Sequence, residues 1–414
     1  MIDKSTIEKV LQSVDIVDVI SEHVTLQKKG SLYWCCCPFH SERTPSMAVS
    51  KARGTFTCYG CGAHGDAVEF LQKLDNLSFP EAIERLAKKS GIQIMHDHRE
   101  RTDEEIEASK YRESLLAAIA VAQDFFVSQL QADSEEARDA RNYAYGRWGE
   151  EYCKSVGIGY APDSWDALPE YCRSRGVDYA HLKDAGIVKF SDKSRKYYSF
   201  FRGRITIPIC DRYGKIISYT ARYFGDNPDE TKYLNTANTL VFEKGNAIFG
   251  LKEAMRQAGR TGRFIIVEGA PDVLRMHSDD VGLTETVATL GTAWSEKQLK
   301  QLQRYAPSLC FIPDADPPKE GEHYGPGIKA VMKNGLEAMR LGFSVSVREI
   351  PVGEDGKKQD PDSFITGCDI FNSLEDVNFA VWYGLKLLNS CSTDTERIEA
   401  LKRICREALV LVED

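Results

Sequence analysis

Three short stretches decide the fold: Phe264-Ile265-Ile266-Val267-Glu268-Gly269, Phe311-Ile312-Pro313-Asp314-Ala315-Asp316 and Asp360-Pro361-Asp362. In the first two, a short apolar run leads into carboxylates. Such runs form buried strands of parallel sheets, and the ligands of these sheets bind beyond the carboxyl ends of the strands. We therefore expect five carboxylates to face one crevice: Glu268, Asp314, Asp316, Asp360 and Asp362.

Carboxylates that converge in this way cannot all stay ionised unless a cation lies among them. Oxygen ligands without a nearby cysteine or histidine are typical of Mg²⁺ or Mn²⁺ sites. The sequence therefore predicts a divalent-metal site for phosphoryl chemistry. Asp272 could cap a helix that starts there. Asp360 and Asp362 could likewise form only a turn and a cap.

Strands and helices alternate from Phe264 onward, as is typical of a parallel α/β unit. We expect strands at 264–267, 286–290, 309–313 and 345–350, and helices from Asp272, at 296–305 and at 328–341. After Asp362 the pattern is helical to the end of the sequence.

A basic segment precedes this unit. Residues 195–263 contain 13 Lys and Arg against 6 Asp and Glu, a local charge of +7, whereas the whole chain carries −9. The segment includes a predicted hairpin, with strands 204–209 and 215–219 joined by Asp211-Arg212-Tyr213-Gly214. A basic surface beside a metal-binding crevice indicates an anionic polymer as substrate.

Two ligand pairs near the N-terminus predict a zinc site. They are Cys37-Pro38-Phe39-His40 and Cys58-Tyr59-Gly60-Cys61, separated by seventeen residues. Paired soft ligands on two turns are typical of tetrahedral zinc. Four protein ligands (Cys37, His40, Cys58 and Cys61) leave no open position, so we expect one structural ion.

Basic and aromatic residues lie between and beside these pairs: Lys51, Arg53, Phe56 and Tyr59. Such a mixture could hold single-stranded bases by stacking, or it could be an ordinary solvated hairpin. The local pattern leaves both interpretations open.

The totals describe an ordinary multidomain protein. The chain has 414 residues, of which 42% are hydrophobic and 28% charged. We expect no membrane-spanning segment and no signal peptide, and hence a cytoplasmic location. The expected divisions are a zinc-binding domain (1–95), a charged linker (96–110), a basic mixed α+β subdomain (111–260), a parallel α/β domain (261–366) and a C-terminal helical segment (367–414).

The combined motifs resemble a known family. The zinc segment Cys-Pro-Phe-His…Cys-Tyr-Gly-Cys-Gly-Ala-His-Gly is similar to that of bacterial DnaG-type primases. Val267-Glu268-Gly269-Ala270-Pro271-Asp272, with Leu290-Gly291-Thr292 and the later aspartates, resembles the Toprim fold of primases and topoisomerases. Residues 202–205, 232–235 and 242–245 resemble the primase polymerase subdomain. The resemblance spans roughly residues 1 to 366.

This resemblance implies synthesis of RNA primers on a single-stranded DNA template from ribonucleoside triphosphates. It implies that Glu268, Asp314 and Asp316 hold catalytic Mg²⁺ and that Asp272, Asp360 and Asp362 complete the acidic site. It also implies template or triphosphate contacts by a set of basic residues: Arg147, Arg202, Arg204, Arg222, Lys232 and Lys244.

The sequence departs from the family pattern in two places. Residues 317–324 lengthen the loop after Asp316, which puts the aim of Asp316 in doubt. About fifty residues follow Asp362, so the usual helicase-binding domain is not expected, although a replicative helicase is a partner that the family implies. A Toprim nuclease, a topoisomerase-like enzyme and a non-catalytic zinc-ribbon DNA-binding protein are the alternatives.

Overall fold

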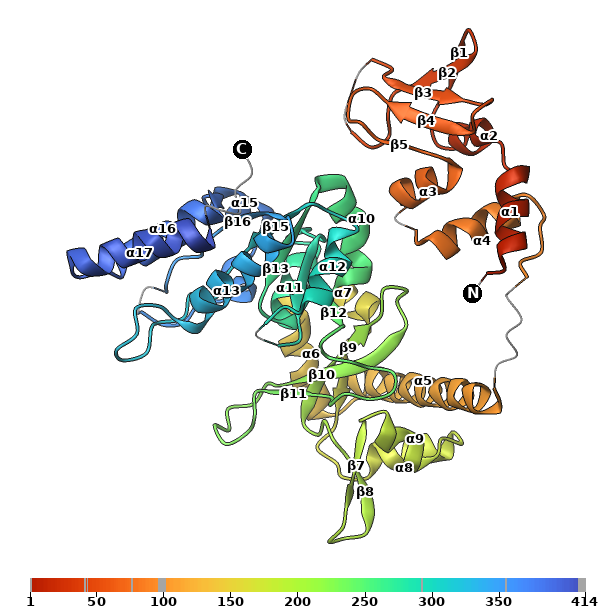
Figure 1. The fold of residues 1–414 in the computed structure, drawn as a ribbon. Coiled ribbons are helices and arrows are strands. Elements are labelled where there is room, and N and C mark those ends of the chain that lie inside the picture. Colours follow the sequence, from red (N-terminus) through yellow and green to blue (C-terminus); the bar gives the residue numbers. More distant parts are fainter. Residues whose placement is uncertain are drawn as a thin grey trace. The chain divides into compact units, whose positions relative to one another are not determined.

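The computed structural model describes residues 2–40, 42, 44–75, 77–95, 102–291, 293–353 and 356–408 (Figure 1). The chain divides into two compact units, Met1–Ile106 and Glu107–Asp414.

The N-terminal unit places helices before and after an antiparallel sheet. The helices are α1 (Lys4–Ser13), α2 (Ile16–Ser21), α3 (Ala67–Asp75) and α4 (Phe79–Lys89). The sheet has the order β1 (Gln27–Lys29), β2 (Leu32–Cys35), β3 (Met47–Ser50), β4 (Thr55–Cys58) and β5 (His64–Gly65). Its core contains the mutually packed rings of Phe39, Phe56 and Phe70. These contacts hold the turn that carries Cys37 and His40 against the sheet.

The predicted linker is partly helical. Helix α5 (Asp103–Leu130) begins inside residues 96–110, of which 96–101 lie outside the described residues. Thr102 accepts the amide of Glu105, and the Glu105 carboxylate accepts the amide of Thr102. Acidic residues in the first turn favour a helix N-terminus. The charge density that suggested a linker therefore belongs, from residue 103 on, to a capped helix start.

A four-stranded antiparallel sheet follows, in the order β11 (Tyr233–Asn235), β10 (Ile216–Tyr223), β9 (Arg204–Cys210) and β6 (Gly159–Ala161). Strands β9 and β10 form the predicted hairpin, although β10 extends to Tyr223. Around it lie α5, α6 (Glu135–Trp148), α7 (Glu150–Val156), α8 (Ala167–Ser174), α9 (Tyr179–Asp184) and the ribbon of β7 (Val188–Ser191) and β8 (Lys196–Ser199).

The second sheet of this unit is the predicted parallel α/β sheet. Its order is β12 (Ile248–Phe249), β14 (Thr286–Thr289), β13 (Arg263–Val267), β15 (Ser308–Phe311), β16 (Ser344–Val347) and β17 (Val377–Asn378). The four central strands are parallel, and β12 and β17 are antiparallel edges. Strand β12 and helix α10 (Leu251–Thr261) pack with this sheet, so the boundary predicted at residue 260 falls inside α10.

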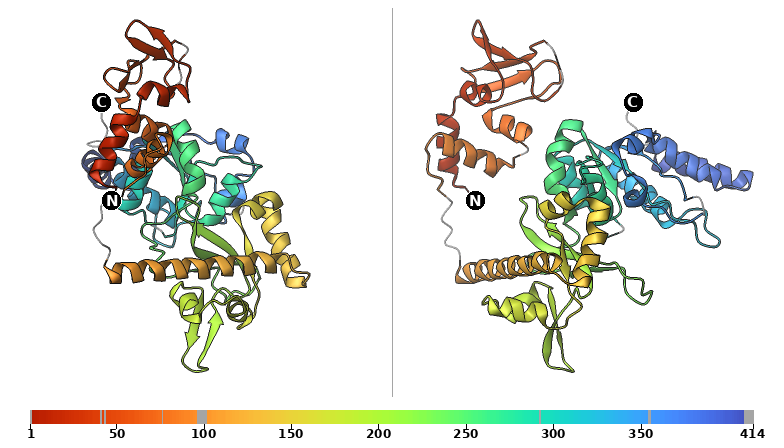
Figure 2. Two further views of the ribbon diagram at one scale, coloured as in Figure 1. Left: turned by 90° about the vertical axis from the view of Figure 1, so that its right-hand side faces the viewer. Right: turned by 180° about the vertical axis from the view of Figure 1, so that it is seen from behind.

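Both faces of this sheet are buried, which explains its continuous apolar runs. Ile265 and Val267 point into one core with α11 (Ala270–His277). Phe264 and Ile266 point into the other core, with helices α10, α12 (Glu296–Gln303), α13 (Pro326–Arg340) and α16 (Phe379–Asn389). Successive residues of β13 therefore face two different cores, and its parallel pairing with β15 places the carboxyl ends of the two strands side by side. Figure 2 shows the strands and helices of this part, in green to blue, from two further sides.

The C-terminal segment is mainly helical, as predicted, with the edge strand β17 in addition. After the short α14 (Pro361–Phe364), which precedes this segment, its helices are α15 (Cys368–Ser373), α16 and α17 (Asp394–Glu407); the prediction for 409–414 lies outside the described residues. No described helix is by itself long and apolar enough to cross a bilayer, and the pair α5 and α6, bent by 97°, meets that test only when joined.

Candidate active site and zinc centre

Three carboxylates gather at the carboxyl ends of the central strands. Glu268 follows β13, and Asp314 and Asp316 follow β15. One oxygen from each of these side chains lies within 4.8 Å of the others. Within the described residues, this is the group of acidic side chains that is arranged to share a cation.

The chemistry of the group fits a divalent ion. Asp314 is only 5% exposed, and its Oδ1 has no hydrogen-bond partner among the described residues. Burial, followed by the charge of Asp314, raises the pKa of Glu268 to about 7. Burial also raises the pKa of Asp314. A buried carboxylate oxygen without a partner is costly, and a bound cation would remove that cost.

The backbone around the group is tightly packed. Glu268 Oε1 accepts the amide of Asp314 at 3.1 Å. Gly327, in the first turn of α13, lies so close that an added Cβ would be 2.6 Å from the Asp314 carbonyl oxygen. The longer loop 317–324 is tied back by the Glu322–Lys329 ion pair (2.6 Å) and by Tyr324, which donates to the Lys386 carbonyl. Asp316 thus reaches the group despite the longer loop.

A lysine occupies the side of the group that faces the cavity. Lys358 Nζ lies 2.6 Å from Asp314 Oδ2 and 2.8 Å from Asp316 Oδ1. Burial lowers the pKa of Lys358, but hydrogen bonds to both carboxylates outweigh it and raise that pKa above its ordinary value. The Lys358 side chain is 48% exposed, whereas those of Asp314 and Asp316 are mostly buried.

A cavity of about 450 Å³ opens beside the carboxylates. Glu268, Asp314 and Lys358 line one side of it, and Lys232 and Tyr233 reach it from the four-stranded sheet. Apolar side chains complete the wall: Trp294, Phe311, Ile312 and Val331. The cavity is therefore shared by both sheets, acidic at one end and flanked by lysines.

Asp272 and Asp360 line this cavity but lie outside the three-carboxylate group. Asp272 accepts the amides of Gly269 and Asp362, and burial together with the charge of Asp314 raises its pKa well above the ordinary value. Asp360 caps α14 through Ser363; burial raises its pKa, but these hydrogen bonds outweigh burial and leave the pKa lowered. Both therefore act as helix caps, which the sequence left open.

Asp362 does not face the crevice, contrary to the prediction. Its side chain is 1% exposed and is paired with Arg147 and with Arg275, whose Nε lies 3.6 Å away. Trp148 Nε1 also donates to it at 3.3 Å. A buried carboxylate needs such partners, and these use its oxygens. The position after Pro361 turns the side chain into the protein, and the sequence pattern carried no signal of that.

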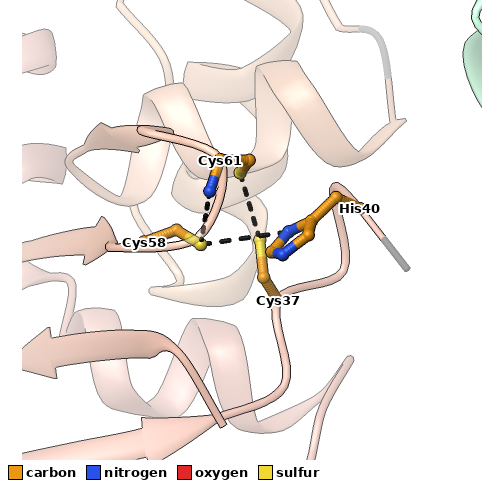
Figure 3. A group of neighbouring side chains, drawn as sticks. All are labelled: Cys37, His40, Cys58 and Cys61. Carbon is orange, nitrogen blue, oxygen red and sulfur yellow. Dashed lines mark hydrogen bonds between the residues drawn. The ribbon is translucent and has the colours of Figure 1, made fainter. Parts of the chain in front are cut away.

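The predicted zinc ligands form a second group (Figure 3). Ligand atoms of Cys37, His40, Cys58 and Cys61 all lie within 4.8 Å of one another. The Sγ atoms of Cys37 and Cys61 are 3.8 Å apart, and Cys58 Sγ is 3.9 Å from His40 Nδ1. Two sulfurs at about 2.3 Å from a tetrahedral zinc would lie about 3.8 Å apart. The group therefore fits zinc.

Backbone amides prepare this group for a metal. The amides of Gly60 and Cys61 point at Cys58 Sγ at 3.3 and 3.4 Å. Burial raises the pKa of Cys58, but hydrogen bonds from Ser46 and these amides outweigh it and lower that pKa to about 7. His40 Nε2 contacts Glu42 at 3.2 Å, which orients the ring. An added Cβ at Gly60 would be 2.6 Å from His40 Nε2, so the turn requires glycine.

Comparison with known families matches three parts of the chain. Residues 2–102 match the CHC2 zinc finger, residues 125–255 the N-terminal domain of the DNA primase catalytic core, and residues 265–365 the Toprim-like family. The order of the three, together with both ligand groups, decides the assignment. The chain belongs to the DnaG primase family.

Relatives of the DnaG family extend this match over most of the chain. A DNA primase of Pseudomonas putida is 35% identical over 374 residues, which cover 90% of this chain and 54% of the relative. The chain thus spans about half the length of that curated relative. The crystal structure of the zinc-binding and RNA polymerase domains of Aquifex aeolicus primase is similar, with a TM-score of 0.55 at 28% identity, covering 97% of this chain and 96% of that one. A DnaG primase catalytic domain bound to single-stranded DNA has a TM-score of 0.57 at 25% identity, covering 73% and 90%.

Three of the six basic residues that the DnaG resemblance implies as substrate contacts form ion pairs or hydrogen bonds with other side chains of the chain. Arg147 pairs with Asp362. Arg204 is 6% exposed and lies 2.5 Å from Glu230. Arg222, 9% exposed, donates to the hydroxyls of Tyr143 and Tyr233. These partners hold the three guanidinium groups in place.

The other three basic residues lie nearer to solvent. Arg202 stacks on Trp165, 3.4 Å from the ring centroid, and pairs with the exposed Asp163 at 2.7 Å. Lys232 lines the cavity, and burial and then the charge of Arg222 lower its pKa. Lys244 lies beside Gly291, 3.8 Å from where a Cβ would be.

In the DnaG zinc ribbon, burial decides which of the predicted aromatic residues could stack on bases. Phe56 is 1% exposed and belongs to the core, so stacking by Phe56 is excluded. Tyr59 is 72% exposed and stacks on Trp34, with ring centroids 6.1 Å apart. Lys51 pairs with Asp15 at 2.5 Å. Of the predicted residues, Tyr59 and Arg53 stay exposed, so stacking by Tyr59 remains a prediction.

Sequence reasoning missed Lys358 and Gly327. Lys358 stands two residues before Asp360 within the run Gly356-Lys357-Lys358-Gln359, and that run is the signal that could have found it. The bridge between Gln359 and Ala315 brings this run beside β15. For Gly327 the only signal in the sequence is the Gly325-Pro326-Gly327 pattern at the start of α13.

Proposed function

We propose that this chain is a DNA primase, a nucleotidyltransferase that synthesises short RNA primers on single-stranded DNA for replication. One observation carries the proposal: the Glu268, Asp314 and Asp316 group, with a partnerless buried oxygen, opens into a cavity flanked by lysines. Binding of single-stranded DNA by a related catalytic domain supports the choice of template. We also propose that the zinc-binding, basic and α/β parts have separate roles in this reaction.

The reaction joins two ribonucleotides. The 3′-hydroxyl oxygen of one attacks the α-phosphorus of an incoming triphosphate, pyrophosphate leaves, and the hydroxyl proton passes to solvent or to a carboxylate. Glu268, Asp314 and Asp316 would hold Mg²⁺ or Mn²⁺, which stabilises the charge on the attacking and leaving oxygens.

The basic residues position the anionic substrates in this proposal. Lys232 and Lys244 bind triphosphate oxygens, because Lys232 lines the cavity and Lys244 lies beside Gly291, which lines it too. Arg202, on the face of Trp165, binds the template backbone. Arg147, Arg204 and Arg222 hold the walls in place and contact substrate less than the resemblance implied. Phosphate contacts of this kind make DNA affinity fall steeply with salt.

We assign one structural zinc ion to Cys37, His40, Cys58 and Cys61. Next to this centre the exposed Tyr59 ring stacks on the half-buried Trp34, and the open face of Tyr59 suits stacking with template bases. A replicative helicase is a further proposed partner, by family likeness alone.

The test is incorporation of labelled ribonucleotides on single-stranded DNA with Mg²⁺ or Mn²⁺. Wild-type protein should extend oligonucleotides, and Glu268→Gln should abolish extension while leaving the thermal unfolding transition in place. The surface variant Glu337→Gln, whose carboxylate pairs with Arg340 at 3.3 Å, is the control and should keep activity. Strand cleavage would instead favour a nuclease, and binding alone a DNA-binding protein; either result contradicts the proposal.

A further inference from the structure

We infer that Lys358 is a built-in cation that occupies the divalent-ion site and must be displaced when the ion binds. The inference rests on the proposed function of the acidic group. It concerns a residue that lies outside the predicted ligand set.

The geometry places the ammonium where an ion would lie. Lys358 Nζ contacts Asp314 Oδ2 at 2.6 Å and Asp316 Oδ1 at 2.8 Å, so it bridges two of the three ligands. These same two oxygens would be needed by a divalent ion held between Asp314 and Asp316. A lysine ammonium and a divalent ion cannot share that position, because both carry positive charge and both need the oxygens.

The Lys358 ammonium neutralises only part of the negative charge of the three carboxylates. Asp314 Oδ1 stays without a partner among the described residues, and Glu268 Oε1 accepts a hydrogen bond from the Asp314 amide. One positive charge therefore faces three carboxylates. A divalent ion would satisfy more of this charge, so exchange of Lys358 for the ion is favourable.

The anchoring of Lys358 allows the exchange without unfolding. The neighbouring Gln359 is bound to Ala315 through both backbone groups, at 2.9 and 3.4 Å. The backbone is thus fixed beside the site. The Lys358 side chain is already 48% exposed, so its rotation into solvent or into the cavity newly exposes little buried surface. The flexible lysine stem supplies that freedom.

A triphosphate bound in the cavity would give the displaced Lys358 ammonium a new partner. Lys358 and Lys232 line the same cavity. A triphosphate carries several negative charges and would draw both ammonium groups to its oxygens. Lys358 would then couple ion binding to triphosphate binding: ion entry frees the lysine, and the lysine engages the phosphates.

The test is Mn²⁺ affinity of the full chain by isothermal titration calorimetry without nucleotide, for wild type and three variants. Lys358→Met keeps the stem length and removes the charge, and it should bind Mn²⁺ about five- to tenfold more tightly, the range for losing one partly exposed competitor. Lys358→Arg keeps the charge and should retain the weaker affinity of the wild type. Lys300→Met removes a surface ion pair of equal length, 2.6 Å, and should change nothing.

A second readout excludes a merely structural lysine. Without divalent ion, Lys358→Met should unfold at a lower temperature than wild type, and saturating Mn²⁺ should restore or reverse the order. Unchanged or weaker Mn²⁺ affinity in Lys358→Met would overturn the inference while leaving the metal site itself intact. Absence of Mn²⁺ binding to the wild type would instead overturn the proposed site.

Discussion

Asp362 and Asp314 are both buried aspartates next to the crevice, and neutralising each should have opposite consequences. Asp362 is surrounded by Arg147, Arg275 and Trp148 Nε1, and its side chain is 1% exposed. Asp314 is crowded by other carboxylates, and one of its oxygens has no partner among the described residues. Asp362→Asn should therefore destabilise the protein, and Asp314→Asn should not.

The magnitudes follow from these surroundings. Removing the charge of Asp362 leaves two largely buried guanidinium groups without it, at a cost of about 3 kcal/mol. For the unit Glu107–Asp414, an unfolding entropy of roughly 2.1 cal/mol/K per residue converts this into a fall in Tm of about 5 °C. Asp314→Asn loses a half-exposed lysine contact but gains relief from repulsion, so its Tm in chelator should stay within about 2 °C of wild type.

Thermal unfolding with chelator and with Mn²⁺ measures both effects. At a Mn²⁺ concentration 100 times Kd, binding adds about 2.7 kcal/mol of stability. This rise should appear in wild type and Asp362→Asn and be missing in Asp314→Asn. The exposed Asp133→Asn is the control and should behave as wild type. The reasoning is refuted if Asp362→Asn unfolds at the wild-type temperature yet loses its response to Mn²⁺, because Asp362 would then be a ligand.

Three further predictions concern other parts of the chain. Gly327→Ala should weaken Mn²⁺ affinity about tenfold or more by calorimetry, because its Cβ would meet the Asp314 carbonyl oxygen, whereas Gly146→Ala, with open space around it, should not; equal affinities would contradict the packing. Burial lowers the pKa of His277 below 6.5, so the unfolded chain takes up a proton that the folded chain resists. Tm should therefore fall as pH drops below about 6.5, less steeply in His277→Gln, and identical slopes would count against it. Chelating zinc, or Cys58→Ser, should unfold the unit Met1–Ile106 and remove the near-ultraviolet signal of Trp34 and Tyr59; a retained signal would show that the metal is dispensable for folding.

Sequence patterns predicted the parts of this protein that depend on local chemistry. The spacing of Cys37 and His40 is a property of one tight turn, and Glu268 follows its strand directly, so neither needed tertiary information. The strands around 264–267 and 309–313 were recognisable because burial on both faces demands continuous apolar residues.

Contacts between distant segments were beyond the sequence. Asp362 meets Arg147 across 215 positions, and no local pattern indicates whether a carboxylate after Pro361 points to the crevice or into the core. Lys358 reaches the acidic group only because Gln359 pairs with Ala315. In the linker, the same charges that suggested an unstructured connection form the first turn of α5, where the Thr102 cap decides the outcome.

The most direct test of the central claim is a crystal of the chain grown with Mn²⁺ and measured at the manganese absorption edge. The account predicts an anomalous peak within coordination distance, about 2.2 Å, of oxygens from Glu268, Asp314 and Asp316, with the Lys358 ammonium moved away. A peak at Asp272, Asp360 and Asp362 instead, or no peak in the cavity, would contradict it.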